Sequence, residues 1–143
     1  MYVIKGTIEK MHNPIHAIAL PTNGTFREDG TAMIDDSVTE NMSKIFPNFS
    51  IALGDRLELY GNHVFYFSDW NLFTFPTADK AFEKMDIKLI EQSCYELSVH
   101  EEYIKGRPIL IPKIGSLYNG VTWADVEALL DRYVHDILVI NGQ

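Results

Sequence analysis

The sequence predicts an α/β fold in which helices pack against a layered sheet. Strand-like and helix-like segments alternate through the second half of the chain, and this alternation is typical of such a sheet. The 143 residues fit one domain, residues 1–143, which is large enough to bury a core without disulfides. Hydrophobic residues make up 46% of the chain and charged residues 22%, which are ordinary values for a globular protein.

The N-terminal part contains two strand-like segments and one helix-like segment. Residues 1–5 and 15–20 are β-prone runs, and the Pro-Thr-Asn-Gly sequence at 21–24 predicts a turn after the second run. A helix is predicted from about residue 37 to 46, because N-capping residues precede it and apolar residues follow at helical spacing. Pro47 ends this helix.

The middle of the chain predicts two neighbouring strands and a long helix. The strands are residues 63–67 and 72–75, which are joined by a turn at 68–71, and Pro76 closes the second strand. A helical pattern then runs from residue 84 to about 103, with one apolar stripe.

The C-terminal part repeats the strand–helix–strand order. Residues 108–112 form a short apolar run that predicts a buried strand, and a loop follows from 113 to 121. Thr122 is a candidate N-cap for an amphipathic helix that ends near residue 133. Residues 136–140 predict the last strand.

Charge disfavours two classes of partner. The formal net charge is −8 and no run of lysine or arginine occurs, so we expect neither a nucleic-acid duplex nor an anionic membrane surface as partner. A small anionic ligand remains compatible, because backbone N–H groups at helix starts bind phosphate without basic side chains.

Cysteine, histidine and hydropathy patterns narrow the class further. Cys94 is the only cysteine, so we interpret it as a packed thiol in a reducing compartment. No segment approaches the roughly 20 apolar residues of a membrane span, and no signal peptide opens the chain. We therefore expect a cytoplasmic protein, or one of the host cytoplasm if the source is viral. The five histidines share no metal-ligand spacing, so we predict no metal and no cofactor.

Three loops that follow predicted strands are candidate ligand-binding segments. They are residues 21–24, 75–77 and 115–120, and ligands of open α/β sheets bind outside the carboxyl ends of strands. In the third loop Gly115 and Gly120 would permit a close backbone approach to an anion. Spacing alone leaves two interpretations of this loop open, an anion cradle and an ordinary turn.

An ordered series of short motifs covers nearly the whole chain. The motifs are Ala19–Gly24, Phe46-Pro47, Leu53-Gly54, Gly61–Val64, Leu72–Thr77, Asp86, Leu89-Ile90 with Ser93, Ile111–Gly115, and Asn119–Trp123 with Val126. This series resembles the macro domain family, in particular its compact bacterial and phage-like branch. The resemblance implies a three-layer α/β/α sandwich around a mixed sheet of about six strands. It also implies a cleft for ADP-ribose or a derivative as the small-molecule partner.

The same resemblance implies which residues contact the ligand. Asn23 would lie against the distal ribose, and the loop 115–120 would surround the pyrophosphate and the distal ribose. Tyr118 is either a cover for the ligand or an exposed loop tyrosine, since an aromatic face can stack on a ribose or a base. The implied ligand-binding set is Thr7, Ile8, Thr22, Asn23, Asp35, Ser37, Pro76, Thr77, Gly115, Ser116, Leu117, Tyr118, Asn119 and Gly120.

Two departures from the family pattern concern ligand binding alone. Many macro domains place an acidic residue after the first strand to accept a hydrogen bond from adenine, whereas this chain has Thr7. The Thr7 hydroxyl can also accept a hydrogen bond from adenine, but it lacks the negative charge that strengthens this bond in an acidic residue. Leu117 and Tyr118 stand where glycines are usual, which narrows the predicted cradle.

Two further departures concern catalysis. Asp35 and Asp36 stand in what is a glycine-rich phosphate loop elsewhere in the family, and they are the candidate catalytic residues if the protein is an enzyme. They are alternatively helix-capping residues, or partners for a cationic group on a modified ADP-ribose. Ala78 replaces the lysine that takes part in catalysis in the branch that removes ADP-ribose from nucleic acid, and Lys80 lies two positions further on.

Three functions are compatible with these observations. The first is a module that recognises or sequesters ADP-ribose or a derivative. The second is a hydrolase, either a phosphatase of ADP-ribose 1''-phosphate or an ADP-ribosyl hydrolase. The third is a protein-contact role with a degenerate cleft. Ala78, Thr7 and the two aspartates favour the first and third. A phage protein of the first kind would suit an anti-defence role against signalling by ADP-ribose-like nucleotides.

Overall fold

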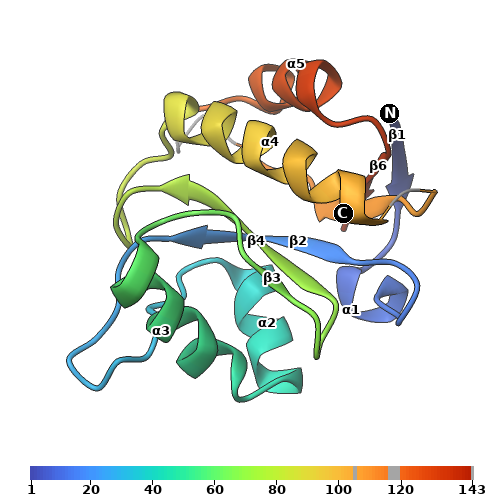
Figure 1. The fold of residues 1–143 in the computed structure, drawn as a ribbon. Coiled ribbons are helices and arrows are strands. Elements are labelled where there is room, and N and C mark those ends of the chain that lie inside the picture. Colours follow the sequence, from blue (N-terminus) through green and yellow to red (C-terminus); the bar gives the residue numbers. More distant parts are fainter. Residues whose placement is uncertain (105, 116–119, 143) are drawn as a thin grey trace.

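The computed structural model describes residues 1–104, 106–115 and 120–142. Helices cover both faces of a single sheet (Figure 1). In chain order the elements of these described residues are β1 (Tyr2–Lys5), α1 (Ile8–Met11), β2 (Ile18–Asn23), α2 (Ser37–Ile45), α3 (Phe49–Tyr60), β3 (Tyr66–Phe67), β4 (Leu72–Ala78), α4 (Ile87–Glu101), the 3-10 turn η1 (Glu102–Ile104), β5 (Ile109–Pro112), α5 (Trp123–Tyr133) and β6 (Ile137–Asn141).

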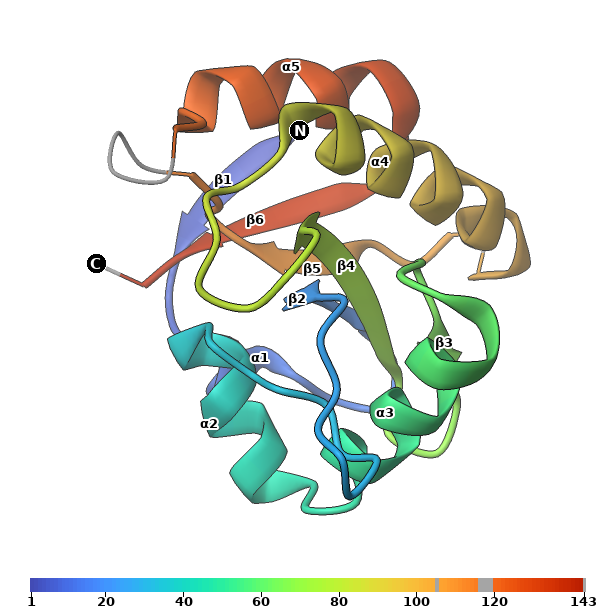
Figure 2. The ribbon, with the colours of Figure 1, turned by 90° about the vertical axis from the view of Figure 1, so that its left-hand side faces the viewer.

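The sheet is mixed and six-stranded, as the resemblance implied. Its order is β1-β6-β5-β2-β4-β3. All neighbouring strands are parallel except β3 and β4, which form an antiparallel pair. Helices α4 and α5 cover one face, and α1, α2 and α3 cover the other (Figures 1 and 2). The predicted three-layer α/β/α fold is therefore confirmed.

The core lies on both faces of the sheet because successive strand residues point to opposite sides. Ala19, Phe73 and Phe75 belong to the cluster under α4 and α5. Ile18 and Leu20 belong to the cluster under α2 and α3. Burial on both faces explains why β2 and β4 read as continuous apolar runs rather than alternating ones.

Strands β2 and β4 extend further than the sequence predicted. The turn expected at 21–24 and the stop expected at Pro76 are both wrong, because β2 continues to Asn23 and β4 to Ala78. The two strands pair in parallel through these positions, with Pro21 opposite Phe75 and Thr22 opposite Pro76. Proline has no backbone N–H to donate to a neighbouring strand, so a strand tolerates it only at a position where no neighbour needs that hydrogen bond.

The chain also contains two helices that the sequence did not predict. The short helix α1 follows β1, and α3 follows α2 after Pro47. Exposed Ile51 and Leu59 blur the amphipathic pattern of α3. Gly54 lies inside α3, and a Cβ at this position would come within 1.8 Å of the carbonyl oxygen of Gly30. Close packing against the 30–32 backbone therefore requires glycine at position 54. Glycine is unfavourable in helices, so its presence hid the helical pattern of α3 in the sequence.

The helix predicted from residue 84 begins at Ile87 instead, because Asp86 caps it. The predicted starts of the other two helices are confirmed. The Asp36 side chain accepts a hydrogen bond from Thr39 N at the start of α2. Thr122 and Asp125 form a reciprocal capping box at the start of α5. No helix of the described residues is long and apolar enough to span a membrane.

Candidate functional site

The ladder between β2 and β5 ends early and leaves a cleft at the carboxyl ends of the strands. The only backbone pair between these two strands in the described residues joins Ile18 to Leu110. Beyond it Pro21 of β2 and Pro112 of β5 line a hollow of about 590 Å³. Ligand pockets commonly measure about 300–1,000 Å³ and lie at this edge of α/β sheets. The cleft is therefore the candidate site.

Four of the predicted ligand-binding residues line this cleft. They are Thr7, Ile8, Ser37 and Gly115. The hydroxyl groups of Thr7 and Ser37 are exposed and have no hydrogen-bond partner in the described part of the chain. Ile8 is only 3% exposed and mainly packs into the core. The cleft therefore presents two free hydroxyl groups, one beyond β1 and one at the start of α2.

Gly115 fixes the start of the loop between β5 and α5. Its φ is 108°, a value that side-chain-bearing residues rarely adopt, and a Cβ there would lie 2.9 Å from Thr122 C and Trp123 N. Gly115 is thus pressed against the N-terminus of α5. Gly120, at φ 79°, is exposed near Lys84. The predicted contacts of Ser116, Leu117, Tyr118 and Asn119 lie outside the described residues.

The lining of the cleft contains two carboxylates and one ammonium group among the described residues, from Glu9, Asp36 and Lys113. Burial raises the pKa of Asp36 above its usual value of 3.8, although hydrogen bonds from Thr39 oppose the shift. The Glu9 carboxylate accepts a hydrogen bond of 3.3 Å from Asn41 Nδ2. Two acidic groups therefore lie beside the space that an anionic ligand would enter.

Asn23 turns its side chain away from the cleft. It is 2% exposed and is absent from the cleft lining. Its Nδ2 donates to Met33 O (3.0 Å) and Asp35 Oδ1 (3.1 Å), and its Oδ1 accepts from Thr25 N (2.9 Å). All of its hydrogen-bonding groups are thus used within the protein. The ligand-binding role implied for Asn23 remains a prediction.

The predicted residues on β2 and β4 are also buried behind the cleft. Thr22 and Thr77 are each 6% exposed, and Thr77 Oγ1 donates to Thr22 O at 3.4 Å. The carbonyl oxygen of Pro76 accepts a hydrogen bond of 2.7 Å from Ser93 Oγ. These groups join the strands to each other and to α4, and their contacts with a ligand stay predictions.

The candidate catalytic residues are engaged in structural hydrogen bonds. Asp35 uses one carboxylate oxygen to accept from Asn23 and the other to accept from Phe82 N at 2.7 Å. Asp36 caps α2 through Thr39. Ala78, where the resemblance implies a catalytic lysine in one branch of macro domains, is 5% exposed and pairs with Asn23 in the sheet. Lys80 is exposed and forms no ion pair in the described residues.

Sequence reasoning missed several residues that line the cleft. Ile140 and Asn141 lie at the carboxyl end of β6, beside β1. The rule that ligands bind at carboxyl ends would have found them, because the strand at 136–140 was itself predicted. Met85 comes from the loop between β4 and α4, and no local signal in the sequence marks it.

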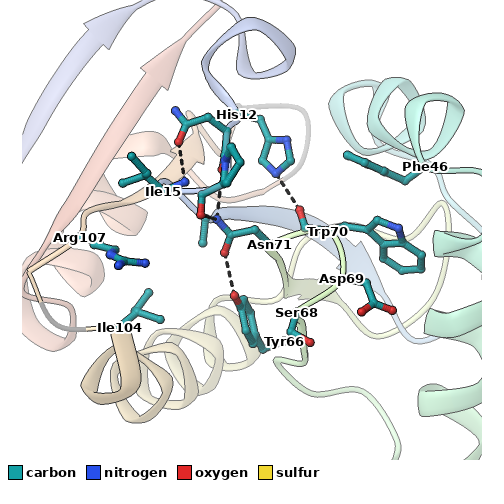
Figure 3. A pocket seen from close by; sticks show the side chains of 13 residues that line it. His12, Ile15, Phe46, Tyr66, Ser68, Asp69, Trp70, Asn71, Ile104 and Arg107 are labelled. Atoms are coloured by element: carbon teal, nitrogen blue, oxygen red, sulfur yellow. Dashed lines mark hydrogen bonds between the residues drawn. The ribbon is translucent and has the colours of Figure 1, made fainter.

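A second hollow lies at the amino ends of the central strands (Figure 3). It measures about 450 Å³, and Ala17, Asn71 and Arg107 in its lining immediately or closely precede β2, β4 and β5. Several of its polar groups form hydrogen bonds with one another. His12 Nε2 contacts Trp70 O at 2.8 Å, and Asn71 Oδ1 accepts a hydrogen bond from the Tyr66 hydroxyl (Figure 3). This hollow lies at the opposite edge from the usual ligand site of such sheets.

Metal and thiol chemistry find no support in the described residues. No group of three or more His, Cys, Asp or Glu side chains within them could hold a metal ion. Cys94 is fully buried, and burial, together with the charge of Glu91, raises its pKa to about 12. A thiol with this pKa stays protonated at neutral pH and is not an active nucleophile.

Comparisons with solved structures identify the fold. No protein-family model and no curated protein matches the chain. The macrodomain of Thermus aquaticus DarG is similar, with a TM-score of 0.78 at 16% identity over 99% of this chain and 97% of that one. The macrodomain of Mycobacterium tuberculosis DarG has a TM-score of 0.75 at 14% identity, again over 99% and 97%. Thermosipho africanus DarTG, solved in complex with ADP-ribose, has a TM-score of 0.74 at 13% identity over 99% of this chain and 42% of that one. This protein therefore has the macrodomain fold.

Proposed function

We propose that residues 1–143 act as one macro-type domain that binds ADP-ribose, or a nucleotide derived from it, in the cleft. The observation that carries the proposal is the early end of the ladder between Ile18 and Leu110, which leaves a hollow of about 590 Å³ at the carboxyl ends of the strands. A ligand of nucleotide size fits such a volume. The ADP-ribose complex of Thermosipho africanus DarTG, which has the same fold, supports this ligand class.

The lining supplies the groups that such a ligand requires. The Thr7 hydroxyl, at the end of β1, can accept a hydrogen bond from an adenine amino group. Lys113 and the backbone at Gly115 lie at the start of the loop that precedes α5, where a pyrophosphate would meet positive charge and a helix N-terminus. The Ser37 hydroxyl is a further hydrogen-bonding group at the other side of the cleft.

Binding is favoured over hydrolysis by the state of the candidate catalytic groups. A general base must be free to reach the proton that it removes. Both oxygens of Asp35 accept hydrogen bonds from the protein, and Asp36 caps a helix. The position of the catalytic lysine is occupied by buried Ala78.

Calorimetry with ADP-ribose tests the proposal. We expect wild type to bind ADP-ribose. Ser37→Glu should weaken this binding about tenfold, because a third carboxylate would be added to the cleft, next to Asp36. Glutamate in the first turn of a helix is favourable, so the variant should stay folded. Ser43→Glu is the matched control, since Ser43 lies on the same helix outside the cleft lining.

Turnover assays separate the alternatives. Incubation with ADP-ribose 1''-phosphate and with an ADP-ribosylated substrate should leave both intact. Release of phosphate or ADP-ribose would establish the hydrolase. An absence of heat with every ADP-ribose derivative would refute the proposal and leave the protein-contact role.

A further inference from the structure

The second hollow, at the amino ends of the central strands, is large enough to hold a small molecule. Its volume of about 450 Å³ lies within the usual range of ligand pockets. Its lining includes the apolar or aromatic side chains of Ile15, Phe46, Tyr66, Trp70 and Ile104 (Figure 3). Ile15 is 60% exposed, and an aliphatic side chain is stabilised when an apolar group covers it. The walls therefore favour a ligand with an apolar body.

Asn71 holds the walls of this hollow in place. Its Nδ2 donates to Asn13 O at 3.2 Å and to Pro14 O at 3.1 Å. Its Oδ1 accepts a hydrogen bond of 2.8 Å from the Tyr66 hydroxyl. These three bonds connect the segment before β2 to the turn between β3 and β4 and orient the Tyr66 ring. A hollow that the protein holds open by its own hydrogen bonds loses little conformational entropy when a ligand enters.

Arg107 supplies a cation that the protein leaves without a counterion. It is exposed, and its guanidinium forms no ion pair and no hydrogen bond within residues 1–104, 106–115 and 120–142. Glu102 and Asp136 share a neighbouring hollow with Arg107, but neither forms an ion pair with it. The Arg107 side chain extends into the second hollow between Ile15 and Ile104 (Figure 3). A guanidinium in this position can bind a carboxylate through two parallel hydrogen bonds.

The charges of the lining set the charge of the ligand. Arg107 and Asp69 are the only Lys, Arg, Asp or Glu residues among the described residues that line the hollow. They lie on opposite sides of it, with Asp69 next to Trp70 (Figure 3). One cation balances one negative charge, and the Asp69 carboxylate would repel a second. The lining thus favours a monoanion over a phosphate dianion.

We propose that the second hollow binds a monocarboxylate with an aromatic or aliphatic body. Arg107 binds the carboxylate, and the body lies against Tyr66 and Trp70. A free acid and the C-terminal residue of a peptide both have this chemistry. The site lies at the opposite edge of the sheet from the cleft, so the inference does not depend on the binding of ADP-ribose.

The fluorescence of Trp70 tests the proposal. The chain has two tryptophans, so Trp123→Phe leaves Trp70 as the only one. In this background 3-phenylpropionate should change the emission of Trp70 saturably. The uncharged amide 3-phenylpropionamide has the same body and should bind about tenfold more weakly, because it cannot form the charged contact with Arg107.

Variants of the two charged residues separate the carboxylate contact from apolar binding. Arg107→Gln should weaken 3-phenylpropionate about tenfold and leave the amide unchanged. Arg107→Lys should weaken it less, because lysine keeps the charge but loses the planar fork. Asp69→Asn should strengthen it about twofold, because a repulsive charge is removed. Arg132→Gln is the matched control, since Arg132 pairs with Glu91 outside the lining.

A second probe identifies the source of the carboxylate. N-acetylglycylphenylalanine carries the same phenyl group and carboxylate at the end of a peptide. Tighter binding of this probe than of 3-phenylpropionate would indicate a peptide C-terminus as the ligand, and weaker binding would indicate a free acid. Both results support the site.

Three results would overturn the inference. They are no saturable change of Trp70 emission at millimolar concentrations of either acid, equal affinity for 3-phenylpropionate and its amide, and unchanged affinity in Arg107→Gln. Calorimetry of Arg107→Gln with ADP-ribose keeps the two proposals apart, because this variant should bind ADP-ribose as wild type does. A wild type that binds 3-phenylpropionate but not ADP-ribose would refute the proposed function and leave this inference standing.

Discussion

The side chains of Asn23 and Asp35 are joined by a hydrogen bond of 3.1 Å from Asn23 Nδ2 to Asp35 Oδ1. This bond connects the end of β2 to the segment that leads into α2. The resemblance to macro domains implied that both residues contact a ligand, but in this structure they first contact each other. A loss of binding on mutation of either residue therefore has two explanations, a lost ligand contact and a lost structural contact.

Asn23→Ala is expected to destabilise the protein. The substitution removes three hydrogen bonds and leaves Met33 O and Thr25 N without a side-chain partner in a region where Asn23 is 2% exposed. Buried groups that lose their partners cost about 1–3 kcal/mol, so we expect the free energy of unfolding to fall by about 2–3 kcal/mol. Urea denaturation would measure it. Asn41→Ala, which removes one exposed hydrogen bond, should change stability by less than about 0.5 kcal/mol; an equal effect of the two variants would contradict the structural role.

Gly54→Ala is expected to destabilise the protein although alanine is the better helix former. The new Cβ would come within 1.8 Å of Gly30 O, so α3 must move away from the 30–32 backbone. Alanine gains roughly 1 kcal/mol from its higher helix propensity. Overpacking of this kind outweighs that gain, so the free energy of unfolding should fall by a net amount of about 1–3 kcal/mol. Thermal unfolding should show a lower melting temperature.

Gly6→Ala is the matched control for Gly54→Ala. Its new Cβ would meet only Met11, 2.9 Å away at the flexible sulfur, and this side chain can move. We expect a melting temperature close to that of wild type. A similar fall in melting temperature in both variants would mean that chain flexibility, rather than the contact with Gly30, explains the need for glycine at position 54.

The sequence predicts those parts of the fold whose signals are local. The helix starts at Asp36 and Thr122 were predictable because the capping groups lie within three residues of their partners in the chain. The antiparallel pair of β3 and β4 was predictable from two apolar runs joined by a short turn. The end of β2 was not, because Pro21 to Asn23 stay in the sheet only through their pairing with β4, about 55 residues further along the chain.

The orientation of the site residues depends on that same long-range pairing. Asn23 pairs with Ala78 and Thr22 with Pro76, so the ladder skips Thr77 at an irregularity. Such bulges change the direction in which a side chain points. The segment that contains Asn23 was predicted from sequence to belong to the site, but no local pattern shows that the Asn23 side chain points toward Met33 and Asp35.

Glu96 is expected to stabilise the protein above acidic pH. Burial alone would raise its pKa, but hydrogen bonds from Val64 N, Gln92 and His63 outweigh this effect, and the pKa lies below its usual 4.5. A carboxylate with a lowered pKa contributes stability above its ordinary pKa, and this contribution is lost as the pH falls through the lowered value. We therefore expect Glu96→Gln to lower the unfolding free energy by about 1 kcal/mol at pH 7.

The decisive measurement is the pH dependence of the difference in unfolding free energy between wild type and Glu96→Gln. The unfolding free energies of wild type and Glu96→Gln should converge as the pH falls below the usual glutamate pKa of 4.5 and through the lowered value. Glu58→Gln serves as the control, because Glu58 is exposed and makes no side-chain hydrogen bond in the described residues. A constant difference between wild type and Glu96→Gln at all pH values would show that the hydrogen bonds do not depend on the charge of Glu96.

Asp36→Asn is expected to strengthen the binding of ADP-ribose at neutral pH. Asp36 lines the cleft, and its ionised carboxylate repels a pyrophosphate. Asparagine caps helices as well as aspartate does and can still accept from Thr39 N, so α2 should keep its start. Removal of one charge at the distance of a bound phosphate is worth about 1 kcal/mol, which corresponds to roughly fivefold tighter binding.

The pH profile of binding distinguishes this repulsion from other effects of the substitution. Burial raises the pKa of Asp36, and the nearby charge of Asp35 adds to the shift, so Asp36 takes up a proton at a higher pH than an ordinary carboxylate. Wild-type affinity for ADP-ribose should therefore increase as the pH falls toward that pKa, and this increase should be smaller in Asp36→Asn. Glu40→Gln removes a charge from the same helix outside the cleft lining and should keep the wild-type profile. Weaker binding by Asp36→Asn at every pH would instead mean that the carboxylate makes a favourable contact with the ligand, as expected if the natural ligand has a cationic group at this end.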